Sequence, residues 1–102
     1  MFTLKKSSLK RGAYECASYA TTSTAVLKQL SRHKDVKVRT AVADNQNTSA
    51  NTYMELAQDG DVDLRYAMAE NHHIDKRTLN CLALDINPFV AYRAQKTLLR
   101  LG

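Results

Sequence analysis

The sequence has little of several residue types on which particular protein classes depend. It contains no tryptophan, one proline, three glycines and two cysteines among 102 residues. So few glycines cannot build glycine-rich phosphate-binding loops. Cys16 and Cys81 are far apart and show no Cys-x-x-Cys spacing, which argues against a disulfide scaffold and against a zinc ribbon. We therefore expect both cysteines to be free and buried as small apolar side chains.

Long apolar runs are also missing. No segment approaches the roughly 18 apolar residues of a membrane-spanning helix. Lys5 and Lys6 are not followed by the apolar stretch and small-residue cleavage site of a secretory signal. The hydrophobic fraction of 44% and the charged fraction of 25% are ordinary for a soluble domain. These features predict one cytoplasmic domain spanning residues 1–102.

The most informative feature that is present is an internal repeat. Steps of 26 residues from Leu4 reach Leu30, Leu56 and Leu82, and most other columns of that frame keep their chemical character. A fixed period of this size is typical of stacked-repeat proteins, in which each unit buries its apolar face against its neighbours. We expect four units, of which the first and last act as caps. Their bounds are 1–26, 27–52, 53–78 and 79–102.

Each unit is predicted to hold two short helices, because its apolar residues recur with helical spacing. Leu27 and Leu30 mark the first helix of the second unit, and Val38 and Val42 mark its second helix. Serine, aspartate or asparagine precedes each helix, and such side chains satisfy the free amides of a first turn. The expected caps are Ser23, Ser49 and Asp75 for the first helices, and Asp35, Asp61 and Asn87 for the second.

The expected helices cover 8–19, 24–33, 36–44, 50–59, 62–70, 76–84 and 88–100. The second helices should stop at Asn45 and Asn71, because asparagine tolerates the left-handed conformation that is common just past a helix end. Together these features predict an all-α fold, a short α-solenoid of about four helix pairs.

The run Asp-Val-x-Val-Arg-x-x-Val-Ala-x-Asn-x-x-Thr at 35–48 has a near copy at 61–71. Both runs resemble the leucine-rich repeat variant, a close relative of HEAT repeats, and the resemblance covers about residues 24–94. It implies a right-handed superhelix of helix pairs. HEAT-type arrays are known mainly as protein-binding scaffolds, with a minority that grip DNA, so the resemblance implies a binding role.

Two columns of the repeat contain candidate binding residues. Arg39 and Arg65 lie one unit apart, each four residues after an aspartate. They either bond an aspartate of their own or the neighbouring unit, holding the units in register, or form a contact strip for an acidic partner. Tyr66 and Tyr92 share a column with Tyr14 and Thr40. Tyrosines in such a column serve as interface anchors or as half-buried packing.

Positive charge is concentrated in the N-terminal half, although the whole chain carries a net charge of only +5. A basic end of this kind can neutralise the phosphates of a nucleic acid, or it can be a solvated cap. Its residues are Lys5, Lys6, Lys10 and Arg11, followed by Lys28, Arg32, Lys34 and Lys37.

The remaining reactive side chains favour neither an enzyme nor a metal site. His72 and His73 are adjacent, an arrangement that rarely directs both rings at one ion, and Asp75 is already expected to cap a helix. Neither cysteine lies in a recognisable nucleophile motif. We therefore expect no catalysis, no cofactor and no metal.

The sequence thus predicts a small non-enzymatic protein-binding module, an adaptor or inhibitor of a partner protein. The alternative is a nucleic-acid-binding module that uses the basic N-terminal half. A third alternative is a homodimer, in which two copies stack through the apolar C-terminal stripe Thr-Leu-Leu-Arg-Leu-Gly.

Overall fold

The structure, a computed structural model, describes the backbone of residues 6–101 and the side chains of residues 12–101. Its described residues form helices and links, without a strand. The seven described helices are α1 (Lys6–Ser18), α2 (Thr24–Leu30), α3 (Val36–Asp44), α4 (Ala50–Leu56), α5 (Val62–Ala69), α6 (Lys76–Leu82) and α7 (Pro88–Leu101).

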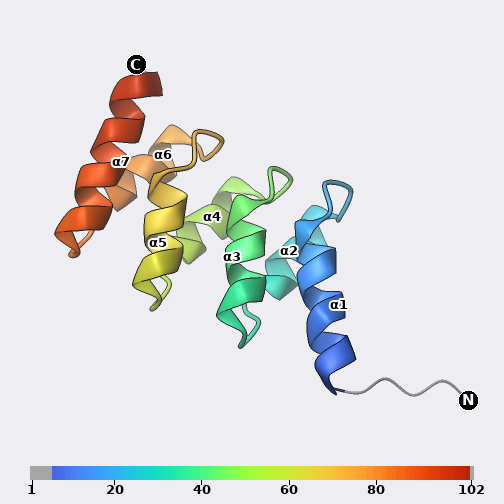
Figure 1. Ribbon diagram of the computed structural model, residues 1–102. Helices are drawn as coiled ribbons and strands as arrows, with labels where there is room; N and C mark the ends of the chain where they lie inside the picture. Colours follow the sequence, from blue (N-terminus) through green and yellow to red (C-terminus); the bar gives the residue numbers. More distant parts are fainter. Residues whose placement is uncertain (1–5, 102) are drawn as a thin grey trace, which may run out of the picture.

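The helices form two rows that run along the long axis of the molecule (Figure 1). Helices α1, α3, α5 and α7 lie side by side in sequence order, and each packs on the next. The shorter helices α2, α4 and α6 form the second row behind them. The overall extents are 54 × 24 × 17 Å, and α1 and α7 lie at opposite ends of the molecule. None of the described helices is long and apolar enough to cross a membrane.

Polar caps start the helices where the sequence predicts them. Ser23, Ser49 and Asp75 accept hydrogen bonds from first-turn amides of α2, α4 and α6. Asp35 and Asp61 do the same for α3 and α5. At the start of α7, Asn87 accepts from the amides of Phe89 and Val90. Each cap satisfies an amide that has no partner within its helix.

The ends of α2, α4 and α6 differ from the prediction, because these helices stop three, three and two residues early. In each case tighter i→i+3 backbone bonds follow the last α-helical turn, as from Arg32 to Gln29 and from His33 to Leu30. Such bonds satisfy terminal carbonyls in a shorter length of chain. Seven-residue helices separated by tight links result.

The predicted left-handed stop at Asn45 is wrong. This residue has φ −83° and ψ 123°, an extended conformation. Its side chain is buried and donates two hydrogen bonds to carbonyls of the preceding unit, 2.9 Å to Ala17 and 2.7 Å to Tyr19. Tertiary contacts, rather than local backbone preference, end α3.

One apolar core runs through the middle of both rows. In the longer helices Val38, Leu64 and Val90 occupy it at intervals of 26 residues, and in α2, α4 and α6 Leu27, Tyr53 and Leu79 do so. The two cysteines are free but half-buried rather than fully buried, and Cys81 packs against this core. Cys81 accepts a 3.3 Å hydrogen bond from Gln58.

Candidate binding groove between α3 and α5

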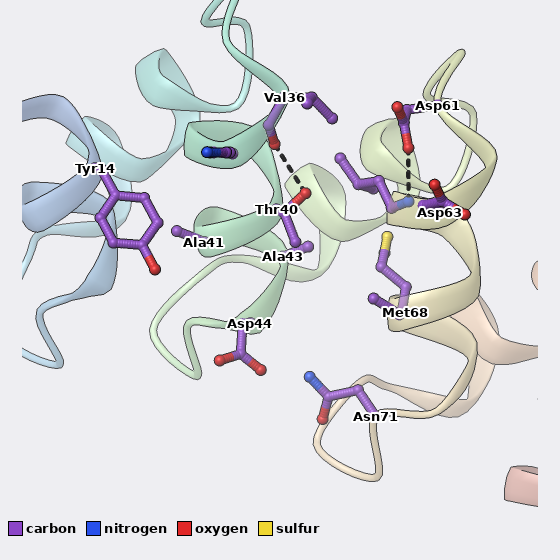
Figure 2. A pocket seen from close by; sticks show the side chains of 13 residues that line it. Tyr14, Val36, Thr40, Ala41, Ala43, Asp44, Asp61, Asp63, Met68 and Asn71 are labelled. Carbon is purple, nitrogen blue, oxygen red and sulfur yellow. Dashed lines mark hydrogen bonds between the residues drawn. The ribbon is translucent and has the colours of Figure 1, made fainter. Parts of the chain in front are cut away.

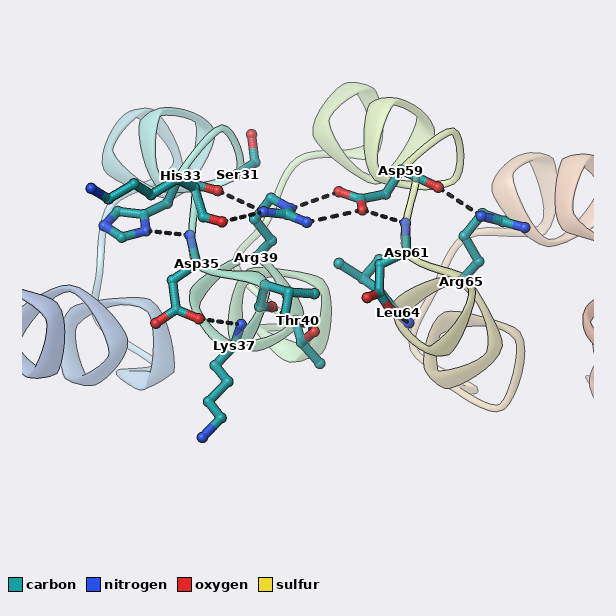
Figure 3. A network of polar contacts seen from close by, with 12 residues as sticks. Ser31, His33, Asp35, Lys37, Arg39, Thr40, Asp59, Asp61, Leu64 and Arg65 are labelled. Carbon is teal, nitrogen blue, oxygen red and sulfur yellow. Dashed lines mark hydrogen bonds and ion pairs between the residues drawn. The ribbon is translucent and has the colours of Figure 1, made fainter.

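In the structure both candidate arginines bond residues in the links between helices (Figure 3). Nε of Arg39 donates to a carboxylate oxygen of Asp59 at 2.8 Å, and Nη2 reaches the other oxygen at 3.3 Å. The remaining Nη1 donates to the carbonyls of His33 and Lys34. Only 19% of the Arg39 side chain and 11% of the Asp59 side chain are exposed. Arg39 is therefore largely enclosed and already hydrogen-bonded.

Arg65 repeats this arrangement one unit later. Its Nε donates to Asp85 at 2.9 Å, and its Nη1 donates to the carbonyl of Asp59 at 2.8 Å. Asp59 thus lies between two arginines, its carboxylate on one and its carbonyl on the other (Figure 3). Burial opposes ionisation of Asp85, but bonds from Arg65 and from the Asn87 amide hold its pKa below 3.8.

The aspartates that bind the arginines belong to a column that the sequence reasoning did not select. Asp35 and Asp61, four residues before each arginine, cap helices instead. Asp59 and Asp85 also accept from the amides two residues further on, and Nδ1 of His33 does so in the equivalent position. The spacing of 20 residues from arginine to aspartate was the available signal.

A different set of contacts surrounds the link that follows α3. Besides Asn45, Nδ2 of Asn47 donates to the carbonyl of Thr22, and the Thr24 hydroxyl donates back to the carbonyl of Asn47. Tyr53 donates from its hydroxyl to the carbonyl of Asn45. Burial raises the pKa of Tyr53, and the nearby carboxylates of Asp44 and Asp75 raise it further, so the phenol remains a donor at neutral pH.

The tyrosine column lies on the outward surface of the longer helices. Tyr14 on α1, Tyr66 on α5 and Tyr92 on α7 are all exposed, and Lys96 lies 5.6 Å from the centre of the Tyr92 ring. We call this surface of α1, α3, α5 and α7 the tyrosine face. The equivalent residue of α3 is Thr40, which is much smaller.

A groove opens on the tyrosine face where that smaller residue lies (Figure 2). It follows the junction of α3 with α5, has a volume of about 880 Å³ and is bounded at one end by Tyr14. This volume lies within the usual range of ligand sites. Its apolar lining consists of Val36, Ala41, Ala43, Leu64, Ala67 and Met68.

The charged residues around the groove are mostly acidic. Asp44, Asp61 and Asp63 line it together with one cation, Lys37. Asp61 is engaged at the start of α5, where it accepts from the Leu64 amide. Asp44 and Asp63 are exposed and form no ion pair with any described residue. The groove therefore combines an apolar floor with a negatively charged rim.

The basic end is described only in part. Lys5 lies outside the described residues, and so do the side chains of Lys6, Lys10 and Arg11, whose backbone belongs to α1. Further along, Lys28, Lys34 and Lys37 are exposed, while Arg32 lies 3.7 Å from Glu55. The exposed cations follow α2 and the start of α3, at the N-terminal end of the molecule.

The histidines do not converge with other ligand-type side chains. Across residues 12–101, no three histidine, cysteine, aspartate or glutamate side chains are grouped closely enough to hold a metal ion. His73 instead contacts Gln46 at 3.3 Å, and Asp75 caps α6.

Comparison of the chain with known protein families, with curated proteins and with solved structures finds no match. What the chain does must therefore be argued from its own residues.

Proposed function

We propose that the protein is a non-enzymatic, protein-binding α-solenoid that works as an adaptor or inhibitor and binds its partner through the tyrosine face. About four 26-residue repeat units of the leucine-rich repeat variant or HEAT-like type, the first and last acting as caps, form a right-handed superhelix in this proposal. The 26-residue recurrence of caps, core residues and Arg–Asp pairs supports it. Free thiols at Cys16 and Cys81 fit the reducing cytoplasm.

The observation that carries the proposal is the exposed tyrosine column beside an apolar groove. Arg39 and Arg65 are engaged in largely buried ion pairs with aspartates, so in this proposal they hold neighbouring units together. Tyr66 and Tyr92 are exposed and can contact a partner. Tyrosine is enriched at the energetic centres of interfaces, because it buries a large area with little loss of side-chain entropy. An apolar groove bounded by Tyr14 is suited to binding the surface of a partner protein.

Affinity capture with the tagged protein tests this proposal. Capture from host lysate is run with and without nuclease, at low and moderate salt, for the wild type and two double variants. Tyr66→Ala with Tyr92→Ala alters the tyrosine face, and Asn51→Ala with Asn80→Ala alters exposed residues of α4 and α6 as a matched control. The proposal expects a stoichiometric protein that survives nuclease, is lost with the tyrosine variant and is kept with the control.

Two other capture results would contradict the proposal. Nucleic acid captured alone, and lost as salt rises, would overturn the proposal in favour of phosphate binding by the basic N-terminal half. Substitution of Lys5, Lys6, Lys10 and Arg11 by alanine should then abolish capture. A second copy of the chain as the only captured protein would instead indicate a homodimer.

A further inference from the structure

We propose that the groove between α3 and α5 receives an aromatic side chain of the partner, flanked in the partner's sequence by lysine or arginine. This inference rests on the proposed function and adds the chemistry of the partner. Three features carry it: an interruption of the tyrosine column, the small residues beside it, and the charge of the rim.

The interruption lies at Thr40. The column holds tyrosine in the three other units, at Tyr14, Tyr66 and Tyr92, so this face of the array already accommodates a phenol at that position. The Thr40 hydroxyl donates back to the Val36 carbonyl at 2.8 Å and is therefore already hydrogen-bonded (Figure 2). A hollow therefore exists where the repeat elsewhere places an aromatic ring.

The residues next to Thr40 keep the hollow open. Ala41 and Ala67, one unit apart in the same column, present only methyl groups to the groove. The equivalent residue one unit later is Arg93, which is half-buried and has its Nε enclosed without a hydrogen-bond partner among the described residues. On α7 this position thus holds the long side chain of Arg93. On α5 it holds only Ala67, which leaves room between α3 and α5 for a side chain of a partner protein.

The acidic side chains at the rim of the groove favour a positively charged group next to the aromatic ring that enters it. Asp44 and Asp63 have no ion-pair partner among the described residues and flank an apolar floor, where Coulomb attraction is screened less than in open water. A lysine or arginine beside the entering ring would pair with them or lie over the exposed Tyr14 ring. Because the carboxylates of Asp44 and Asp63 outnumber Lys37, the one cation among the described residues that line it, the groove favours a cation over a phosphate.

Three small phenols test the inference directly. Tyramine, p-cresol and 4-hydroxyphenylacetate carry the same ring with a positive, neutral and negative substituent, and each is titrated against the protein by methyl NMR. We expect saturable shifts at Ala41, Ala67 and Met68, with affinity falling severalfold at each step from tyramine to the anion. Asp44→Asn with Asp63→Asn, or added salt, should reduce the difference.

Thr40→Tyr fills the groove with the chain's own ring and should weaken tyramine binding at least tenfold. Thr40→Ser is the matched control, because it keeps the position small, and it should retain binding. Circular dichroism and thermal unfolding verify that both variants fold. Unchanged binding to Thr40→Tyr, equal affinity for all three phenols, or no saturable shift would each overturn the inference. Partner capture that still depends on Tyr66 and Tyr92 would leave the proposed function standing in any of these cases.

Discussion

At the scale of single residues, the pair of Arg65 with Asp85 shows how burial changes the value of a charge. Only 13% of the arginine and 7% of the aspartate side chain are exposed. Removal of one member leaves the other enclosed without its partner. We expect Arg65→Ala to lower the free energy of unfolding by about 3 kcal/mol, measured by urea denaturation.

The exposed pair of Arg32 with Glu55 provides the control for this prediction. These side chains are 67% and 49% exposed, and their closest charged atoms are 3.7 Å apart. Solvent screens such pairs, so Arg32→Ala should change stability by at most about 0.5 kcal/mol. A double-mutant cycle over Arg65 and Asp85 isolates their coupling. Equal effects of Arg32→Ala and Arg65→Ala would contradict the role given to burial.

The pKa of Asp85 predicts how stability depends on pH. Burial opposes its ionisation, but Arg65 and the Asn87 amide lower its pKa below the ordinary 3.8. A depressed pKa contributes stability above the unfolded value, and this contribution is lost as pH falls through the folded pKa. The difference in unfolding free energy between the wild type and Asp85→Asn should stay constant from pH 7 to about pH 5 and shrink below about pH 4. A constant difference down to pH 2.5 would refute the assignment.

At the scale of helices, α2, α4 and α6 are too short to be stable alone, so their caps and packing hold them in place. Asp75 accepts from both the amide and the hydroxyl of Thr78, at 3.0 and 2.8 Å. Asp75→Ala should cost about 1 kcal/mol and raise hydrogen exchange in the first turn of α6. Lys76→Ala, an exposed change in the same turn, is the control and should leave exchange unchanged.

Helix starts could be predicted from the sequence because the signals that produce them are local. A side chain such as Asp61 caps an amide three residues ahead, and the two positions are visible together in the chain. The ends of the helices were harder to predict from the sequence. Asn45 stops α3 by donating to carbonyls 26 and 28 residues earlier, and only the folded chain brings those groups together.

The candidate site shows the same limit. The sequence indicated that Arg39 and Arg65 are equivalent and offered a bond to an aspartate of the same or the neighbouring unit, but it did not identify Asp59 and Asp85, 20 residues further on, as the partners. The groove was not predicted either. Thr40 was visible as an exception in the tyrosine column, but a small residue makes a hollow only when the helix beside it is also lined with small side chains such as Ala67.

At the scale of the whole molecule, the main helix contacts join neighbours in the sequence or helices two apart. The charge and polarity of the exposed side chains also change along the long axis of the molecule. Exposed cations gather at the N-terminal end, acidic groups line the central groove, and the apolar side chains of Leu84, Ile86 and Phe89 are exposed near the start of α7.

The α-solenoid that we propose should loosen from the nearest end when one junction is weakened, because stability in such arrays is close to a sum over neighbouring units. Asn45→Ala removes the bonds to Ala17 and Tyr19 and should raise hydrogen exchange in α1 and α2 while α5 to α7 stay protected. Arg65→Ala breaks the later junction and should raise exchange in α6 and α7 instead.

Hydrogen exchange followed by mass spectrometry distinguishes this behaviour from a single cooperative unit. If both variants raised exchange equally in all seven helices, the array would unfold as one body, and the neighbour-only picture would be wrong. The expected result, in which each variant raises exchange at a different end of the molecule, would also indicate how stable the groove is. Apart from Tyr14 on α1 and from Asp61 and Asn71 beside α5, the groove draws its lining from α3 and α5, the two helices that lie between the weakened junctions. Because those helices have packed neighbours on both sides, the floor of the groove should be the last part of the molecule to open.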